Sequence, residues 1–205
     1  MVRNHMRCLV SMVGFAILSF ASAHAQTDIG LSGYRSFNTS ATGNGTIQIP
    51  TDSYGGMVEV RHISAPFIGY EITYAFNPDN QSLSPKVGAC TYECSNQPET
   101  ISTKANEVAL DWVVSKKFGK LRPFAVGGLG FFIAVPSGNL YDLNTIVKPA
   151  FVYGGGVDWN LASHFGLRFQ VRDNLYKAPD IAGLYYATGA FVHTTEPMGG
   201  AFFRF

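Results

Sequence analysis

Eight segments of this 205-residue chain are rich in β-forming residues, and several alternate apolar with polar side chains. In "FGLRFQVRD", the apolar Phe165, Phe169 and Val171 alternate with the charged Arg168 and Arg172. Successive side chains of a strand point to opposite faces, so a period of two predicts strands with one apolar and one polar face. The segments span residues 27–38, 54–63, 67–77, 105–116, 121–135, 147–160, 164–175 and 196–205. The sequence therefore predicts an all-β fold.

The connectors between these segments alternate in length. The short ones span residues 63–67, 117–121 and 161–165, and the long ones span 39–53, 78–104, 136–146 and 176–195. A membrane barrel gives this pattern, because its turns are short at one rim and its loops are longer at the other. We therefore expect one domain, an eight-stranded antiparallel up-and-down transmembrane β-barrel.

The first 25 residues have the features of a cleaved signal peptide. Arg3 and Arg7 precede the apolar stretch "CLVSMVGFAILSFA", and Ala23 and Ala25 form a small–x–small site before Gln26. The alternative is a membrane anchor, but a spanning helix needs about 20 apolar residues, more than this stretch contains. We therefore expect a signal peptide at 1–25 and an exported barrel domain at 26–205.

The apolar faces carry too many large rings for the inside of a small barrel. The rings belong to Tyr70, Tyr74, Phe76, Trp112, Phe131, Phe151, Tyr153, Trp159, Phe165, Phe169 and Phe203. An eight-stranded barrel has an interior only just wide enough for its side chains. Charged residues make up 14% of the chain, against about 25% in an ordinary soluble domain. We expect the rings to face lipid; the alternative is a soluble secreted barrel that binds an apolar ligand.

The opposite faces mix charged side chains with small ones, and we expect them to line the lumen. The candidate luminal charges are Glu59, Arg61, Glu71, Glu107, Asp111, Asp158, Arg168, Arg172 and Arg204. These five acids and four bases are close to balance, and an unpaired buried charge is costly. The sequence therefore predicts a network of ion pairs that fills the lumen and leaves no wide pore. The net charge of +1 does not favour a nucleic-acid partner.

The chain ends in "GGAFFRF", where Ala201, Phe203 and Phe205 alternate up to the final residue. With the signal peptide and the eight strands, this ending resembles the small bacterial outer-membrane β-barrels, the OmpA/OmpX-like group. The resemblance implies an outer-membrane location, contact with outer-membrane lipid, and a C-terminal signal read by the barrel assembly machinery. Gly199 and Pro197 continue the alternation only weakly.

Few residues suggest chemistry beyond this architecture. Cys90 and Cys94 lie in the longest connector, and an exported chain can join them in a disulfide; two cysteines without a nearby histidine make a metal site the weaker alternative. His62 and Ser64 resemble the His-x-Ser pair of outer-membrane lipid A deacylases, but they lie early in the chain at a short turn and lack an evident orienting carboxylate. We expect no catalytic residue, metal or cofactor.

Two glycine-rich stretches and one short motif have structural explanations. The stretches at 126–130 and 153–157 lie within predicted strands, where glycine makes room for bulky neighbours, rather than at the start of a helix as a phosphate loop requires. The motif "GNG" at 43–45 fits a turn in the first long connector.

The sequence favours a non-enzymatic outer-membrane barrel with a structural or surface-interaction role through its external loops. The alternatives are a narrow pore for ions or small solutes and a lipid-modifying envelope enzyme. Such an enzyme would need a histidine within hydrogen-bonding distance of both a hydroxyl and a carboxylate. The sequence does not name an extracellular partner.

Overall fold

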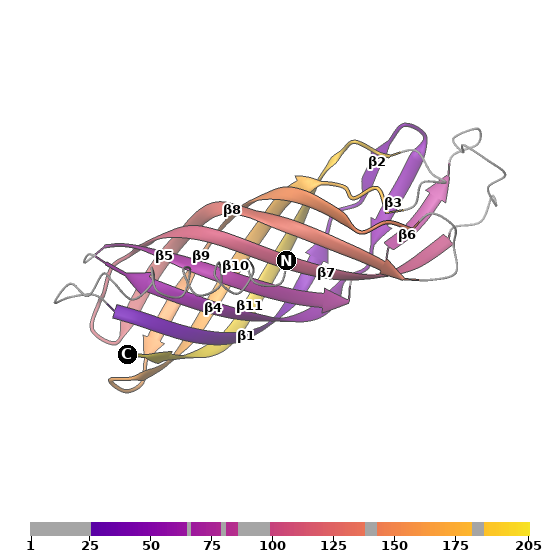
Figure 1. The fold of residues 1–205 in the computed structure, drawn as a ribbon. Helices are drawn as coiled ribbons and strands as arrows, with labels where there is room; N and C mark the ends of the chain where they lie inside the picture. The colour runs from indigo at the N-terminus through magenta and orange to yellow at the C-terminus, as the bar shows by residue number, and fades with distance from the viewer. Residues whose placement is uncertain (1–25, 65–66, 79–80, 86–98, 138–142, 182–186) are drawn as a thin grey trace, which may run out of the picture.

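The computed structural model describes residues 26–64, 67–78, 81–85, 99–137, 143–181 and 187–205, and these residues form strands, turns and connecting segments (Figure 1). The strands are β1 (Gln26–Asn38), β2 (Ala41–Gly43), β3 (Thr46–Pro50), β4 (Ser53–Ile63), β5 (Ile68–Pro78), β6 (Gln81–Pro85), β7 (Glu99–Ser115), β8 (Leu121–Ser137), β9 (Ile146–Asn160), β10 (Phe165–Lys177) and β11 (Phe191–Arg204). In this described part of the chain, no helix is long and apolar enough to cross a bilayer.

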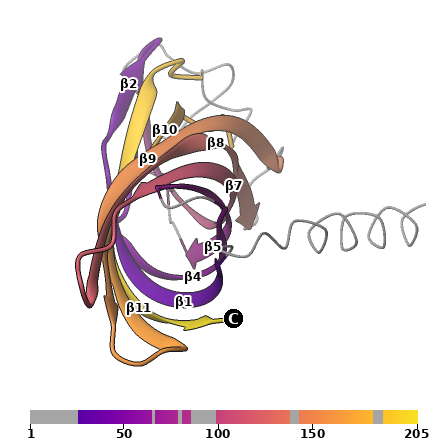
Figure 2. The same cartoon turned by 90° about the vertical axis from the view of Figure 1, so that its left-hand side faces the viewer.

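Eight of the strands close into a barrel. Around the wall they follow the order β7, β5, β4, β1, β11, β10, β9 and β8, and β8 pairs again with β7. Every neighbouring pair is antiparallel, as in an up-and-down barrel. Figure 2 shows the strands curving around a common centre. The predicted fold class is therefore confirmed, and the eight predicted segments correspond to these eight strands.

The long connectors at 39–53 and 78–104 were expected as loops, and the structure corrects this. They contain β2, β3 and β6, and β7 begins at Glu99. β3 pairs with β6 and β6 with β7, so the wall continues beyond the barrel on one side (Figure 1). The three added strands are only three to five residues long, which leaves little room for an alternating pattern.

A tight turn joins β2 to β3. Gly43 pairs with Thr46, and the two residues between them have positive φ angles, 47° at Asn44 and 78° at Gly45. Positive φ at both central positions is typical of the Asn-Gly hairpin turn. The turn predicted at 43–45 is confirmed.

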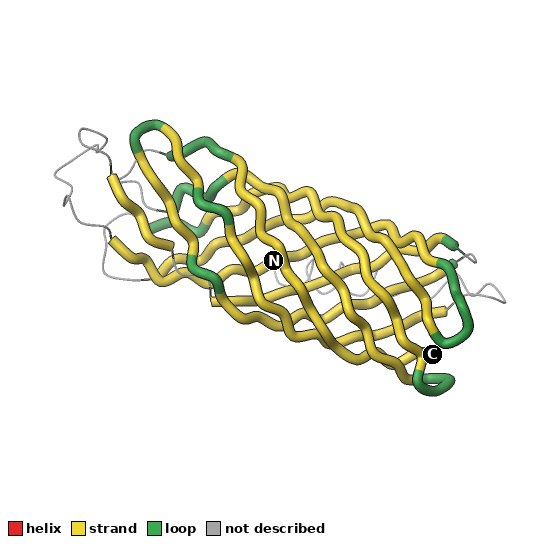
Figure 3. Tube along the Cα trace, turned by 180° about the vertical axis from the view of Figure 1, so that it is seen from behind, coloured by secondary structure: helices red, strands yellow, loops and turns green. Residues whose placement is uncertain are grey.

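The short connectors at 117–121 and 161–165 lie at the end of the barrel where the C-terminus lies, opposite the added strands (Figure 3). At one of them the backbone amide of Phe118 donates to the carbonyl of Leu121 at 2.7 Å, and Gly119 adopts a φ of 59°. We call this end the turn rim and the opposite end the loop rim. The predicted signal peptide at 1–25 and the cysteines Cys90 and Cys94 lie outside the described residues.

Candidate functional site

The inner and outer faces of the barrel are chemically opposite. On β10, Phe169 is 50% exposed on the outside, whereas Arg168, the next residue in the chain, is 1% exposed on the inside. Of the eleven rings expected to face lipid, all but the half-buried Tyr70 are at least 40% exposed. The outside is therefore an apolar belt, and the buried charged side chains lie on the inside, as in a barrel surrounded by lipid.

A dense group of ion pairs fills the lumen near the turn rim. Arg168 on β10 contacts Glu59 and Asp158, each at 2.6 Å. Arg61 on β4 contacts Glu71 at 2.6 Å and Asp158 at 3.4 Å. These five side chains come from β4, β5, β9 and β10, and none is more than 1% exposed. The five charged groups of this layer are therefore shielded from solvent.

Arg204 joins this group across the seam between the first and last strands of the barrel. Its Nε donates to Asp28 on β1 at 2.8 Å, and its Nη1 donates to the side-chain amide oxygen of Asn160. Asp28 also lies 3.7 Å from Arg168. The seam is therefore held by side-chain contacts as well as by the backbone ladder.

Two buried rings pack against the guanidinium groups. The Arg61 guanidinium lies 3.9 Å from the ring centre of Phe124, and those of Arg168 and Arg204 each lie 5.0 Å from Phe202. Cation–π contacts of this kind strengthen when the cation is desolvated. Phe202 therefore points inward with Arg204, whereas Phe203 faces the apolar belt.

A second polar layer lies closer to the loop rim. Arg172 contacts Asp111 at 3.3 Å, and the amide of Asn174 donates to Glu107 at 2.7 Å. Glu196 is buried on β11, directly across the ladder from Arg172. Three carboxylates therefore share this layer with one guanidinium.

A buried apolar cluster, which we call the apolar plug, lies inside the barrel towards the loop rim. The rings of Phe132 on β8 and Tyr176 on β10 stack with their centres 4.2 Å apart. Ile101, Ile181 and Val192 belong to the same buried cluster. From turn rim to loop rim, the lumen therefore holds ion pairs, a carboxylate-rich layer and an apolar plug.

Glycines in the wall make room for these side chains. A Cβ on Gly128 would clash with the Leu110 carbonyl and the Asp111 carboxylate, and one on Gly156 would lie 2.8 Å from the Phe124 ring. Both glycine-rich stretches lie within strands, β8 and β9, as the sequence predicts.

The structure places all nine predicted luminal charges on the inner side of the wall, and it adds three that the sequence reading missed. The missed residues are Asp28, Arg122 and Glu196, each at most 9% exposed. Period-two counting could have found them, since each shares a face with a luminal residue of its own strand. With them, the interior holds seven carboxylates and five guanidiniums instead of five and four.

A nucleophilic site needs one histidine that contacts both a hydroxyl and a carboxylate, and here two different histidines make these two contacts. Nδ1 of His62 lies 2.9 Å from the hydroxyl of Thr27, whereas Nδ1 of His193 lies 2.8 Å from the carboxylate of Asp173. His193, expected in an external loop, lies on β11. Ser64 is exposed beyond the end of β4. Over the described stretches of the chain, no group of three or more His, Cys, Asp or Glu side chains could hold a metal ion.

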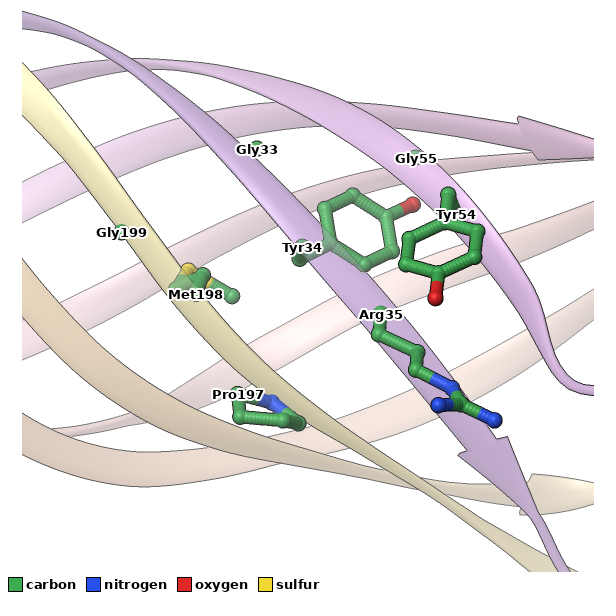
Figure 4. A pocket seen from close by; sticks show the side chains of 8 residues that line it. All are labelled: Gly33, Tyr34, Arg35, Tyr54, Gly55, Pro197, Met198 and Gly199. Atoms are coloured by element: carbon green, nitrogen blue, oxygen red, sulfur yellow. The ribbon is translucent and has the colours of Figure 1, made fainter.

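A depression of about 480 Å³ marks the outer wall where β4, β1 and β11 meet (Figure 4). Gly33 and Gly199 lie along it, Pro197 borders it, and Arg35 and Tyr54 stand at the end towards the loop rim. It is a feature of the lipid-facing surface, separate from the lumen, and we call it the wall groove.

No family model matches the chain, and no curated protein matches it. Solved structures do. Neisserial surface protein A matches with a TM-score of 0.60 at 10% identity, over 87% of this chain and 97% of that one. OprG of Pseudomonas aeruginosa matches with a TM-score of 0.60 at 13% identity, over 87% and 95%. Ail of Yersinia pestis matches with a TM-score of 0.54 at 15% identity, over 88% and 99%.

At sequence identities this low, the matches show the fold alone. That fold agrees with the apolar outer face and the charged inner face of the barrel. A closed wall leaves no unpaired edge in lipid, and the apolar belt surrounds it. The chain has the fold of the small eight-stranded β-barrels of bacterial outer membranes, the class that its sequence resembles.

Proposed function

We propose that this protein is a non-enzymatic outer-membrane barrel that holds an external structure in place for contact with other surfaces. The proposal rests on two features seen together: the lumen is filled, and the wall continues beyond it at the loop rim. We call this continuation, formed by β2, β3, β6 and the first residues of β7, the extension. A lumen filled by buried ion pairs and an apolar plug favours an anchor over a static pore. The extension is then the part of the protein that contacts other surfaces.

The extension is fixed to the barrel by several contacts. The side-chain amide of Asn44 donates to the carbonyl of Ala187 at 2.8 Å, and that of Gln48 donates to Pro179 at 3.1 Å. Gly43 packs so closely on Thr188 that a Cβ there would clash with the Thr188 carbonyl. The hairpin of β2 and β3 therefore rests on residues that follow β10 and on residues that lead into β11. A surface held in this way loses little conformational entropy when a partner binds.

The names of two similar structures agree with this role. One is called a surface protein and the other an attachment invasion locus protein.

The test compares cells that make the wild-type protein with cells that make a variant whose residues 40–49 are replaced by Asn-Gly. We expect the variant to lose adhesion and cell–cell aggregation to the level of cells without the protein, while detergent resistance and heat-modifiable gel mobility stay unchanged. Lys120→Ala, at the turn rim, is the control and should behave as wild type. Full adhesion by the trimmed variant, or stepwise ionic conductance of the wild-type protein in planar bilayers, would overturn the proposal.

A further inference from the structure

The wall groove exists because side chains are missing from the lipid-facing surface. A Cβ on Gly33 would meet no atom within 4 Å, and one on Gly199 would meet only the Phe169 ring at 3.6 Å. Neighbouring side chains therefore do not fill the space. Where glycine removes the side chain, a ligand can approach the backbone closely.

The groove follows an interruption in the backbone ladder. β1 and β11 pair from Asp28 with Arg204 up to Tyr34 with Met198, and pairing resumes at Phe37 with Thr195. Pro197 lies opposite the gap, and proline has no N–H to donate. Beneath the surface, Tyr34 and Met198 pack together in a buried cluster that forms the floor. The groove is thus an apolar furrow with a closed bottom.

Arg35 lies near the outer end of the apolar belt, with the exposed ring of Phe37 beyond it on the outward face of β1. Along β1, the outward residues below it are the exposed Ile29 and Leu31, followed by Gly33. At this level the neighbouring strands carry polar residues, Asp52 next to β4 and Thr195 on β11, among exposed rings. The rings are Phe37, Tyr54 and, further out, Phe191. Polar side chains mixed with aromatic rings are typical of the level of lipid head groups. Because the longer loops of a membrane barrel face the outside of the cell, the loop rim is the outer-leaflet side.

The guanidinium of Arg35 is held in place but remains accessible. It lies 4.7 Å from the ring centre of Phe37 and 5.6 Å from that of Tyr54. It contacts Asp52 at 3.5 Å, with 46% and 42% of the two side chains exposed. Exposed pairs of this kind contribute little, so an anion can compete with Asp52. A guanidinium matches the oxygens of a phosphate through two parallel hydrogen bonds.

We propose that the wall groove binds an anionic, phosphate-bearing lipid of the outer leaflet, with one acyl chain along Gly33 and Gly199 and the phosphate at Arg35. The furrow supplies apolar contact for the chain, and the cation at its outer end supplies charge complementarity for the head group. This site does not depend on the role proposed for the external extension.

The test measures how many molecules of bis-phosphorylated lipid A the folded protein retains in zwitterionic micelles, by native mass spectrometry over a titration. We expect one tightly retained lipid A per wild-type protein and weaker retention of phosphatidylcholine. Gly33→Leu fills the furrow, and Arg35→Gln removes the cation; each should weaken retention about tenfold. Asp52→Asn frees Arg35 from its carboxylate and should strengthen retention.

Gly127→Leu is the matched control. Gly127 faces outward from β8, on the opposite wall, and a Cβ there would meet only a carbonyl oxygen at 4.0 Å. This variant adds the same side chain to the same kind of surface and should retain lipid A as the wild type does. Equal retention by all variants, or equal retention of phosphatidylcholine, would show ordinary annular lipid and overturn the proposal. Heat-modifiable gel mobility establishes that each variant is folded.

Discussion

Single charged residues in the lumen stabilise the fold by pairing with other buried charges. Arg168 is the clearest case, because it contacts Glu59 and Asp158 at 2.6 Å and Asp28 at 3.7 Å. A buried pair often adds little over apolar packing, yet removal of one partner leaves the other charge stranded. The ion pairs of Arg168 therefore add little net stability, but its removal would be costly because three carboxylates would stay buried without their cation.

Arg168→Ala should lower the free energy of unfolding by about 3 to 5 kcal/mol, since its carboxylate partners would remain buried without their cation. The measurement is urea-induced unfolding in micelles, followed by heat-modifiable gel mobility. Arg35→Ala, which removes an exposed guanidinium, is the control and should change the free energy by less than about 1 kcal/mol. An unchanged unfolding midpoint for Arg168→Ala would contradict the view that the network is buried and dry.

The inward charges were predictable from period-two counting, but their partners were not. Arg61 and Asp158 are 97 positions apart, and Arg168 and Glu59 are 109 apart. Which charges meet depends on the stagger between strands around the whole wall, and the alternation within one strand carries no information about that stagger. The sequence therefore predicted the chemistry of the lumen, while the pairing required the structure.

The length of a strand determines whether it can be predicted from the sequence. The eight barrel strands run for at least 11 residues each, long enough for apolar and polar faces to show. β2, β3 and β6 have three to five residues, and their place follows from pairing with each other and with β7. Tertiary pairing, rather than local pattern, determines these short strands.

The predicted assembly signal occupies the end of β11 and the final residue, Phe205, which directly follows it. The ring of Phe205 is 69% exposed and packs edge-on against Phe203 with ring centres 5.2 Å apart, while its backbone amide donates to Thr27 at 2.9 Å. The backbone bond closes the seam whatever the side chain is. The exposed ring is therefore available to a partner, and we propose that it serves the recognition by the barrel assembly machinery that the family resemblance implies.

Phe205→Ser should sharply lower the amount of protein assembled in the outer membrane of cells, while refolding of the purified chain in micelles changes little. Loss of one exposed aromatic pair costs about 1 kcal/mol, too little to unfold the barrel. Quantitative blotting of outer-membrane fractions and refolding yields measure the two effects. Phe191→Ser removes an exposed ring at the other end of the same strand and should leave assembly intact. Equal loss in cells and in micelles would mean that Phe205 acts through stability alone.

The whole molecule depends on lipid because of the belt that surrounds it. Rings such as Trp112, Phe131 and Phe169 are at least half exposed, and a contiguous apolar surface of this kind is not stable in water. The barrel that they cover is closed and filled, so it should resist unfolding by detergent at room temperature.

The mature chain should therefore appear in the outer-membrane fraction and migrate differently on a detergent gel before and after boiling. Boiling separates the strands, so the compact cylinder becomes an extended chain with a different mobility. The same sample without heating is the internal control. Recovery of the protein in the soluble fraction, with no shift on heating, would contradict the membrane assignment.

The seam between β1 and β11 sets the order of events in folding. Asp28 and Arg204 are bonded across 176 positions of the chain, a contact of very high contact order. Closing so large a loop is entropically costly and slow. Before β11 arrives, the growing sheet has two open edges, which hydrocarbon cannot satisfy. We therefore expect the barrel to close only after the last residues of the chain have been exported.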